Sequence, residues 1–146
     1  MHPSTAPVTR TRFHVSAGAR PYVLTAPSTP TAPKAARDFV HAVLRRTALF
    51  PLLDTAVLLT SEAVTRAHLH TPHTADILLR MLTTGHGLRI SVHGRAPVRI
   101  PPPAPGGQPD DYGVLLTGRL ADDWGTTPPE DLPRPAALWF ELRLGQ

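Results

Sequence analysis

Hydrophobic residues recur at helical spacing in two stretches of the first half of the chain. The first stretch predicts a helix over about residues 32–47, with Pro33 in the first turn, where a missing N–H removes no helical hydrogen bond. Pro51 then interrupts the pattern. The second stretch predicts a helix that begins near residue 52 or 54, continues to residue 70 and is stopped by Pro72.

Strand-like runs lie on both sides of these two helices. Short runs at residues 12–15 and 22–25 precede the first helix. After the second helix, residues 75–82 and 88–92 are joined by Thr84-Gly85-His86-Gly87. Two apolar runs separated by such a short, glycine-containing segment predict a β-hairpin.

The last third of the chain is less regular. Residues 94–111 are rich in proline and glycine, which predicts a long irregular loop of the kind that is often functional. We expect a third helix over residues 113–124, with Trp124 among its core positions. A closing strand over residues 136–144 is predicted by its aromatic and apolar residues.

Length and composition indicate one globular domain over residues 12–146, after a flexible segment over residues 1–11. Hydrophobic residues make up 41% of the chain, and no apolar run approaches the roughly 20 residues of a membrane span. The N-terminus has no apolar signal-peptide core, so we expect no membrane partner and a cytoplasmic location. The absence of cysteine excludes disulfides and thiolate metal sites.

The formal net charge of +4 is distributed unevenly. Residues 1–46 carry seven basic side chains and one acidic side chain, whereas residues 95–146 carry five basic and seven acidic ones. A basic end of this kind can bind nucleic acid. No aromatic interleaving or nucleic-acid motif accompanies it, so a solvated basic face is the favoured interpretation.

The run Ser61-Glu62-Ala63-Val64-Thr65-Arg66-Ala67-His68-Leu69-His70 is the most informative segment. It resembles the "N box" of the GHKL (histidine-kinase-like, or Bergerat) ATPase fold, in the version found in small bacterial anti-sigma-factor kinases. The resemblance implies that Glu62 prepares a water or a substrate hydroxyl. The family's asparagine four residues later holds the Mg²⁺ that carries ATP, and here that position is Arg66. A guanidinium has no acceptor and cannot ligate a metal.

Four other segments resemble the same family, in the same order along the chain. They are the first-helix phrase at 35–40, the approach to the N box at 53–59, Leu120-Ala121-Asp122-Asp123-Trp124-Gly125 and the closing Leu138-Trp139-Phe140-Glu141-Leu142. The resemblance, over roughly residues 20–145, implies an α/β fold. Its architecture is a two-layer sandwich with helices on one face of a mixed, mostly antiparallel sheet.

Two further positions of the nucleotide site depart from the family. The aspartate that accepts a hydrogen bond from the adenine amino group is aligned with Gly94. The second glycine box, which cradles phosphates on backbone N–H groups, retains only Gly113, with Asp111 bringing a carboxylate to the site. Together with Arg66, these changes predict a degenerate nucleotide cleft and no metal site.

The spacing of Glu62 and Arg66 leaves three interpretations open. They could form an exposed ion pair on the helix surface. Arg66 could instead fill the vacated metal position and neutralise Glu62, which we favour, or it could grip a phosphate without metal. His68, His70 and His73 resemble a metal-binding cluster, but His68 and His70 point away from each other on a helix, so packing is the favoured role. Asp122 and Asp123 are predicted to lie on the C-terminal face of the third helix.

The resemblance therefore implies a regulatory protein of the anti-sigma-factor kinase type that acts mainly by binding another protein. Its partner would be a sigma factor or an antagonist protein, and the chain could form a homodimer. This interpretation favours a binding protein over an enzyme and expects no cofactor. The alternative is an active Ser/Thr protein kinase that uses Mg-ATP and Glu62 as its base.

Overall fold

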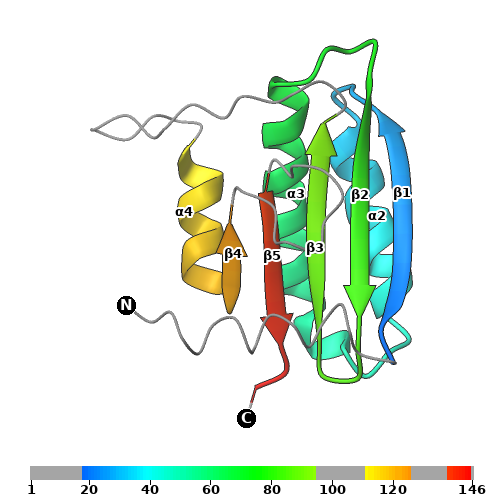
Figure 1. Ribbon diagram of the computed structural model, residues 1–146, viewed down its shortest axis with the longest axis vertical. Coiled ribbons are helices and arrows are strands. Elements are labelled where there is room, and N and C mark those ends of the chain that lie inside the picture. The colour runs from blue at the N-terminus through cyan, green and yellow to red at the C-terminus, as the bar shows by residue number, and fades with distance from the viewer. Residues whose placement is uncertain (1–17, 95–110, 126–137, 146) are drawn as a thin grey trace.

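A layer of helices covers one face of a five-stranded sheet in the computed structural model, which describes residues 18–94, 111–125 and 138–145 (Figure 1). The elements in chain order are strand β1 (Arg20–Pro27), helix α2 (Ala32–Leu44), the 3-10 helix η1 (Phe50–Leu52), helix α3 (Leu53–Leu69), strands β2 (Asp76–Thr83) and β3 (Gly87–Gly94), helix α4 (Asp111–Leu120), and strands β4 (Asp123–Gly125) and β5 (Leu138–Arg143). The described residues therefore form a two-layer α/β sandwich.

The strands lie in the order β1-β2-β3-β5-β4, and every pairing between described strands is antiparallel. The prediction of a mixed sheet is therefore wrong for this part of the chain. Two helices separate β1 from β2, so the chain returns to the end of the sheet at which β1 finished (Figure 1). A crossover through a single helix would instead have placed these neighbouring strands parallel.

The core lies between the sheet and the helices and follows the two periodicities of the sequence. Alternate residues of the strands are buried against the helices, because successive side chains of a strand point to opposite faces. Helix α3 contributes small side chains to this face, which lets it approach the sheet closely. The main buried residues are Ile77, Leu79 and Met81 of β2, Leu88, Ile90 and Val92 of β3, Leu138, Phe140 and Leu142 of β5, Ala36, Val40 and Leu44 of α2, and Ala56, Ala63 and Ala67 of α3.

The predicted hairpin is confirmed, since β2 and β3 pair antiparallel from Ile77 with Gly94 to Thr83 with Leu88. Thr84 closes the turn. Its backbone N–H donates to the Gly87 carbonyl at 2.9 Å, and its hydroxyl oxygen accepts from the Gly87 N–H at 3.1 Å. The turn residues identified in the sequence are therefore the ones that reverse the chain.

The predicted C-terminal part of the third helix is wrong. Helix α4 ends at Leu120, and Trp124 lies in the short strand β4, opposite Phe140 of β5. Asp122 and Asp123 therefore do not form a helical face. The Asp122 N–H donates to the Glu141 carbonyl at 2.9 Å, so pairing with a distant strand overrides the local helical pattern.

Several predictions concern residues outside the described ranges. These are the flexible segment at 1–11, the strand at 12–15, the loop between Gly94 and Asp111, and the first two residues of the closing strand. Among the described helices, none is long and apolar enough to cross a membrane.

Candidate functional site

Helix α3 carries the N-box run and lies between α2 and α4, with which it makes contact (Figure 1). Its orientation is fixed on the α2 side by a hydrogen bond from the Arg37 Nη1 group to the Ser61 hydroxyl oxygen at 2.9 Å. The face toward the sheet is apolar and includes Ala56, Ala63 and Ala67. The remaining inward flank of α3 therefore faces α4.

Arg66 lies on this flank. It is five residues beyond Ser61, which turns it by about 140° around the helix from the α2 side. Its side chain is only 7% exposed, whereas Glu62, one turn earlier on the same side, is partly exposed. The ion pairs formed among the described residues do not include Glu62 with Arg66, so the close pairing expected from their spacing is not observed there.

The two glycines of the candidate site lie at the same end of the molecule as the C-terminal half of α3. Strand β3 ends there at Gly94, which is paired with Ile77, and α4 begins there at Asp111 with Gly113 in its first turn (Figure 1). Helix α3 contacts both β3 and α4. The topology thus brings together the elements that carry Glu62, Arg66, Gly94 and Gly113, which are separated by up to 51 positions in the sequence.

At the histidine-rich end of α3, the His68 side chain has a structural role. Its Nδ1 atom is hydrogen-bonded to the Ser28 hydroxyl at 3.0 Å, and the same hydroxyl donates to the Thr71 carbonyl at 3.0 Å. Ser28 is fully buried, and its N–H donates to the Ala75 carbonyl at 3.0 Å. Across the described residues, no group of three or more His, Cys, Asp or Glu side chains is arranged to hold a metal ion. These hydrogen bonds connect the C-terminal end of α3 to the segment between β1 and α2.

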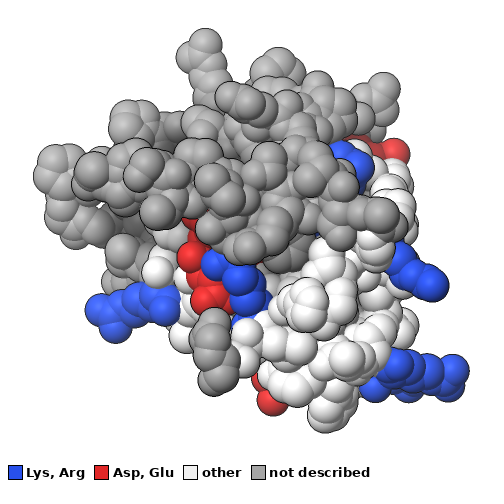
Figure 2. Space-filling view, turned by 60° about the horizontal axis from the view of Figure 1, so that its bottom comes forward, with Lys and Arg blue, Asp and Glu red and all other residues white. Residues whose placement is uncertain are grey.

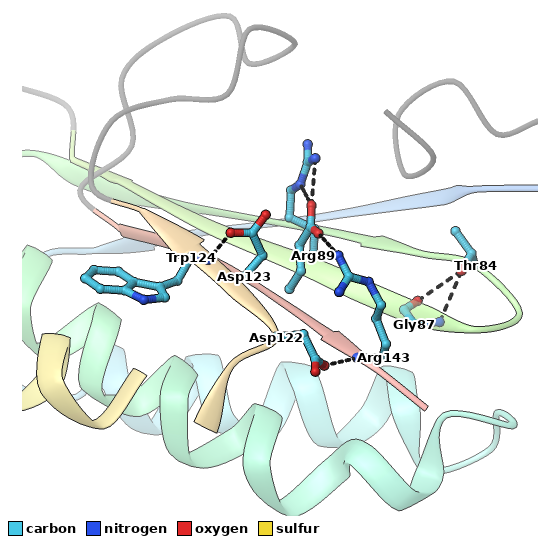
Figure 3. Close-up of polar contacts among 8 residues, drawn as sticks. Thr84, Gly87, Arg89, Asp122, Asp123, Trp124 and Arg143 are labelled. Atoms are coloured by element: carbon cyan, nitrogen blue, oxygen red, sulfur yellow. Dashed lines mark hydrogen bonds and ion pairs between the residues drawn. The ribbon is translucent and has the colours of Figure 1, made fainter. Parts of the chain in front are cut away.

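A second polar cluster lies on the face of the sheet that points away from the helices (Figure 3). The Arg89 Nε and Nη2 groups each lie 2.8 Å from Oε2 of Glu141, and Arg143 Nη2 donates to Oε1 at 3.1 Å. The Arg89 guanidinium also stands over the Trp139 ring, 5.7 Å from its centroid. Arg89 and Glu141 are 3% and 0% exposed. The sequence patterns did not predict this cluster.

The chemistry of this cluster is structural. Burial raises the pKa of Glu141 above its ordinary value, against the opposing charge of Arg89. Both oxygens of the carboxylate accept hydrogen bonds from guanidinium groups and the residue is fully buried, so the carboxylate is held in place and is not presented to a substrate. One feature of the sequence could have indicated this cluster. Polar residues occupy alternate positions of β3, where Arg89, Ser91 and His93 interrupt an apolar run.

Comparison with known proteins does not assign the chain to a family. The chain matches no model of a known protein family, and no characterised protein is significantly similar to it in sequence. The candidate site is therefore defined by its residues and by the elements that bring them together.

Proposed function

We propose that this chain is a cytoplasmic regulatory protein of the anti-sigma-factor kinase type, built on a GHKL-like fold, whose nucleotide cleft no longer binds Mg-ATP. It would act by binding a sigma factor or an antagonist protein. The proposal is supported by the two-layer sandwich and by the position of the N-box helix between α2 and α4. It is also supported by the five sequence segments that follow the family's order.

The observation that carries the proposal is the burial of Arg66. At 7% exposure, its side chain lies within the protein, and helical geometry turns it away from the α2 side of α3 that Ser61 marks. The family's metal ligand would occupy this position. A guanidinium offers only donors and a positive charge, so it opposes Mg²⁺ where an amide oxygen would bind it. Gly94 removes the acceptor for the adenine amino group as well, and a directional hydrogen bond of this kind contributes about 1–3 kcal/mol.

An active kinase is the second candidate, and one observation favours it. Glu62, the family's base, is partly exposed on the same side of α3 and is not in an ion pair with Arg66 among the described residues. A carboxylate in this state could still orient a hydroxyl group. The two candidates differ in their need for ATP.

Calorimetric titration with ATP and ADP, with and without Mg²⁺, separates the two candidates. We expect no heat of binding and no thermal stabilisation at millimolar Mg-ATP. A ligand present at about 100 times its dissociation constant would add about 2.7 kcal/mol to the free energy of unfolding. Mg²⁺-dependent binding in the submicromolar range, with phosphate transfer that is lost in Glu62→Gln, would establish the kinase instead.

A gain-of-function variant tests the assignment of the two altered positions. Arg66→Asn combined with Gly94→Asp restores the metal ligand and the adenine acceptor, and we expect weak, Mg²⁺-dependent ATP binding to appear. Arg66→Gln with Gly94→Ala is the matched control, because it removes the charge without restoring the family's residues. Binding by the control and not by the restored variant would contradict the alignment of the site.

The partner is tested with purified proteins. We expect the full chain to co-elute with one of the alternative sigma factors, or with an antagonist protein, encoded in the same genome, and to do so without nucleotide. Binding that requires ATP would contradict the proposal.

A further inference from the structure

The turn between α2 and α3 is closed by a set of local hydrogen bonds. We call residues 45–52 the α2–α3 corner. The Thr47 hydroxyl donates to the Leu44 carbonyl at 2.9 Å and accepts from the Leu49 N–H at 3.0 Å. The Phe50 N–H donates to the Thr47 carbonyl at 3.1 Å, and the Leu52 N–H donates to the Leu49 carbonyl at 2.8 Å. Leu49, at 1% exposure, anchors this corner in the core.

Phe50 is nevertheless 57% exposed at the outside of this corner. It is the one exposed Phe, Tyr or Trp side chain among the residues whose burial the structure describes. An exposed aromatic ring on a flexible loop would have to be ordered when a partner binds, and that ordering reduces affinity. Here hydrogen bonds already hold the backbone that carries the ring, so the corner presents an apolar contact on an ordered turn.

The charge around Phe50 is positive. Arg45 and Arg46 are both exposed, and residues 44–53 contain no acidic side chain, the nearest being the exposed Asp54. Figure 2, in which this end of the molecule is turned toward the viewer, shows basic side chains projecting at the margin of an uncharged surface, with acidic atoms at its lower edge. Aromatic and arginine side chains together are the residues that most often dominate the binding energy of protein interfaces.

We infer that the α2–α3 corner docks an acidic segment of a partner protein, with an apolar side chain of that segment against Phe50 and its carboxylates on Arg45 and Arg46. This inference rests on the proposed function only in taking the partner to be a protein. A single exposed ring provides little apolar area for insertion into a membrane. The other large exposed apolar residues, Val23, Leu58, Leu69 and Leu120, lie on other elements.

The test uses the full chain and a defined peptide. The peptide is a fluorescent helical 15-mer with four glutamates and three leucines on one face, and its binding is followed by fluorescence anisotropy and by ¹H–¹⁵N spectra. We expect saturable binding that weakens with salt, with the shifted amides concentrated in residues 44–54. Phe50→Ser and the pair Arg45→Glu with Arg46→Glu should each weaken binding at least tenfold.

The matched control is Arg20→Glu with Arg119→Glu, which makes the same change in net charge at exposed residues outside the corner. We expect it to weaken binding less than threefold. All variants should remain folded at the assay temperature, because the altered side chains are exposed. Equal weakening by the control would show that only net charge matters and would overturn the inference. Tighter binding to phosphatidylserine vesicles or to duplex DNA than to the peptide, or no peptide binding, would also overturn it.

Failure of this inference is distinguishable from failure of the proposed function. A sigma factor that binds Phe50→Ser as tightly as the wild-type protein would refute the corner as the docking site and leave the proposed function standing. Conversely, a corner that binds the acidic peptide in a chain that binds no sigma factor or antagonist would retain the inference and refute the function.

Discussion

The buried pair of Arg89 and Glu141 offers the sharpest test of the energetics of this fold. Arg89→Met keeps most of the side chain's volume and removes the guanidinium. Glu141, which is fully buried, then retains Arg143 as its basic neighbour at 3.1 Å among the described residues. Arg143 is 28% exposed and makes one contact, whereas Arg89 places two nitrogens 2.8 Å from the carboxylate. Loss of Arg89 therefore removes most of the compensation for the buried charge.

The magnitude follows from the desolvation of the two groups. Removing one partner of a buried ion pair costs about 3–5 kcal/mol, because the other charge stays buried without compensation. We expect about 3 kcal/mol for Arg89→Met, since Arg143 remains, and a loss of similar size for Glu141→Leu. Replacing both residues removes both desolvation costs, so the double variant should lie within about 1–2 kcal/mol of the wild type.

Urea denaturation, followed by far-ultraviolet circular dichroism and by tryptophan fluorescence, measures the four free energies of unfolding. A domain of this size has about 5–15 kcal/mol of stability, so each single variant should still fold. Two results would refute the reasoning. One is a loss below about 1 kcal/mol in Arg89→Met, and the other is a double variant whose loss equals the sum of the two single losses.

Three further predictions concern buried contacts. Gly125→Ala should lower the free energy of unfolding by about 1–3 kcal/mol in urea, because its Cβ would lie 2.7 Å from Nε1 of Trp139. Ser28→Ala should cost about 1–3 kcal/mol, because it removes the hydroxyl that donates to the Thr71 carbonyl. The raised pKa of Glu141 means that the folded state binds its proton more tightly than the unfolded state does. The stabilisation that comes from this proton is therefore fully present below the unfolded pKa and is lost as the pH rises through the folded pKa. The free energy of unfolding of the wild type, relative to that of Glu141→Gln, should therefore increase as the solution is acidified.

Each of these predictions has a simple contrary outcome. Wild-type stability of Gly125→Ala with an unchanged tryptophan fluorescence spectrum would mean that the Trp139 ring moves at no cost. Wild-type stability of Ser28→Ala would mean that the two hydrogen bonds of the Ser28 hydroxyl make no net contribution. A stability difference between wild type and Glu141→Gln that does not change between pH 7 and pH 4 would contradict the direction of the Glu141 pKa shift.

Much of the secondary structure was predictable because it depends on short-range chemistry. The hairpin follows from Thr84 and Gly87 between two apolar runs, and the helical spacing of apolar residues located α2 and α3 to within a few residues. Side chains three or four residues apart share a helix face whatever the rest of the chain does. Local patterns of this kind can be read without knowing the fold.

The candidate site was predictable only in part. The sequence indicated that Glu62 and Arg66 share a side of one helix, and the structure brings that helix into contact with the elements that carry Gly94 and Gly113. The burial of Arg66 could not be predicted, because it depends on which distant segments pack against α3. The expected contact between Glu62 and Arg66 illustrates the same limit, since helical spacing permits a pair and does not require one.

Tertiary pairing decided the rest. The residues that end α4 and place Trp124 in β4 could have continued a helix, and it is their pairing with β5, from Asp123 opposite Glu141 to Gly125 opposite Trp139, that makes them a strand. Arg89 and Glu141 are 52 positions apart and meet only because β3 and β5 are neighbours in the sheet. By itself the sequence determined the local periodicities and turns, because these depend on neighbouring residues. The sheet order, the end of α4 and the buried ion pair depend on contacts between distant segments, whose free energies no local pattern encodes.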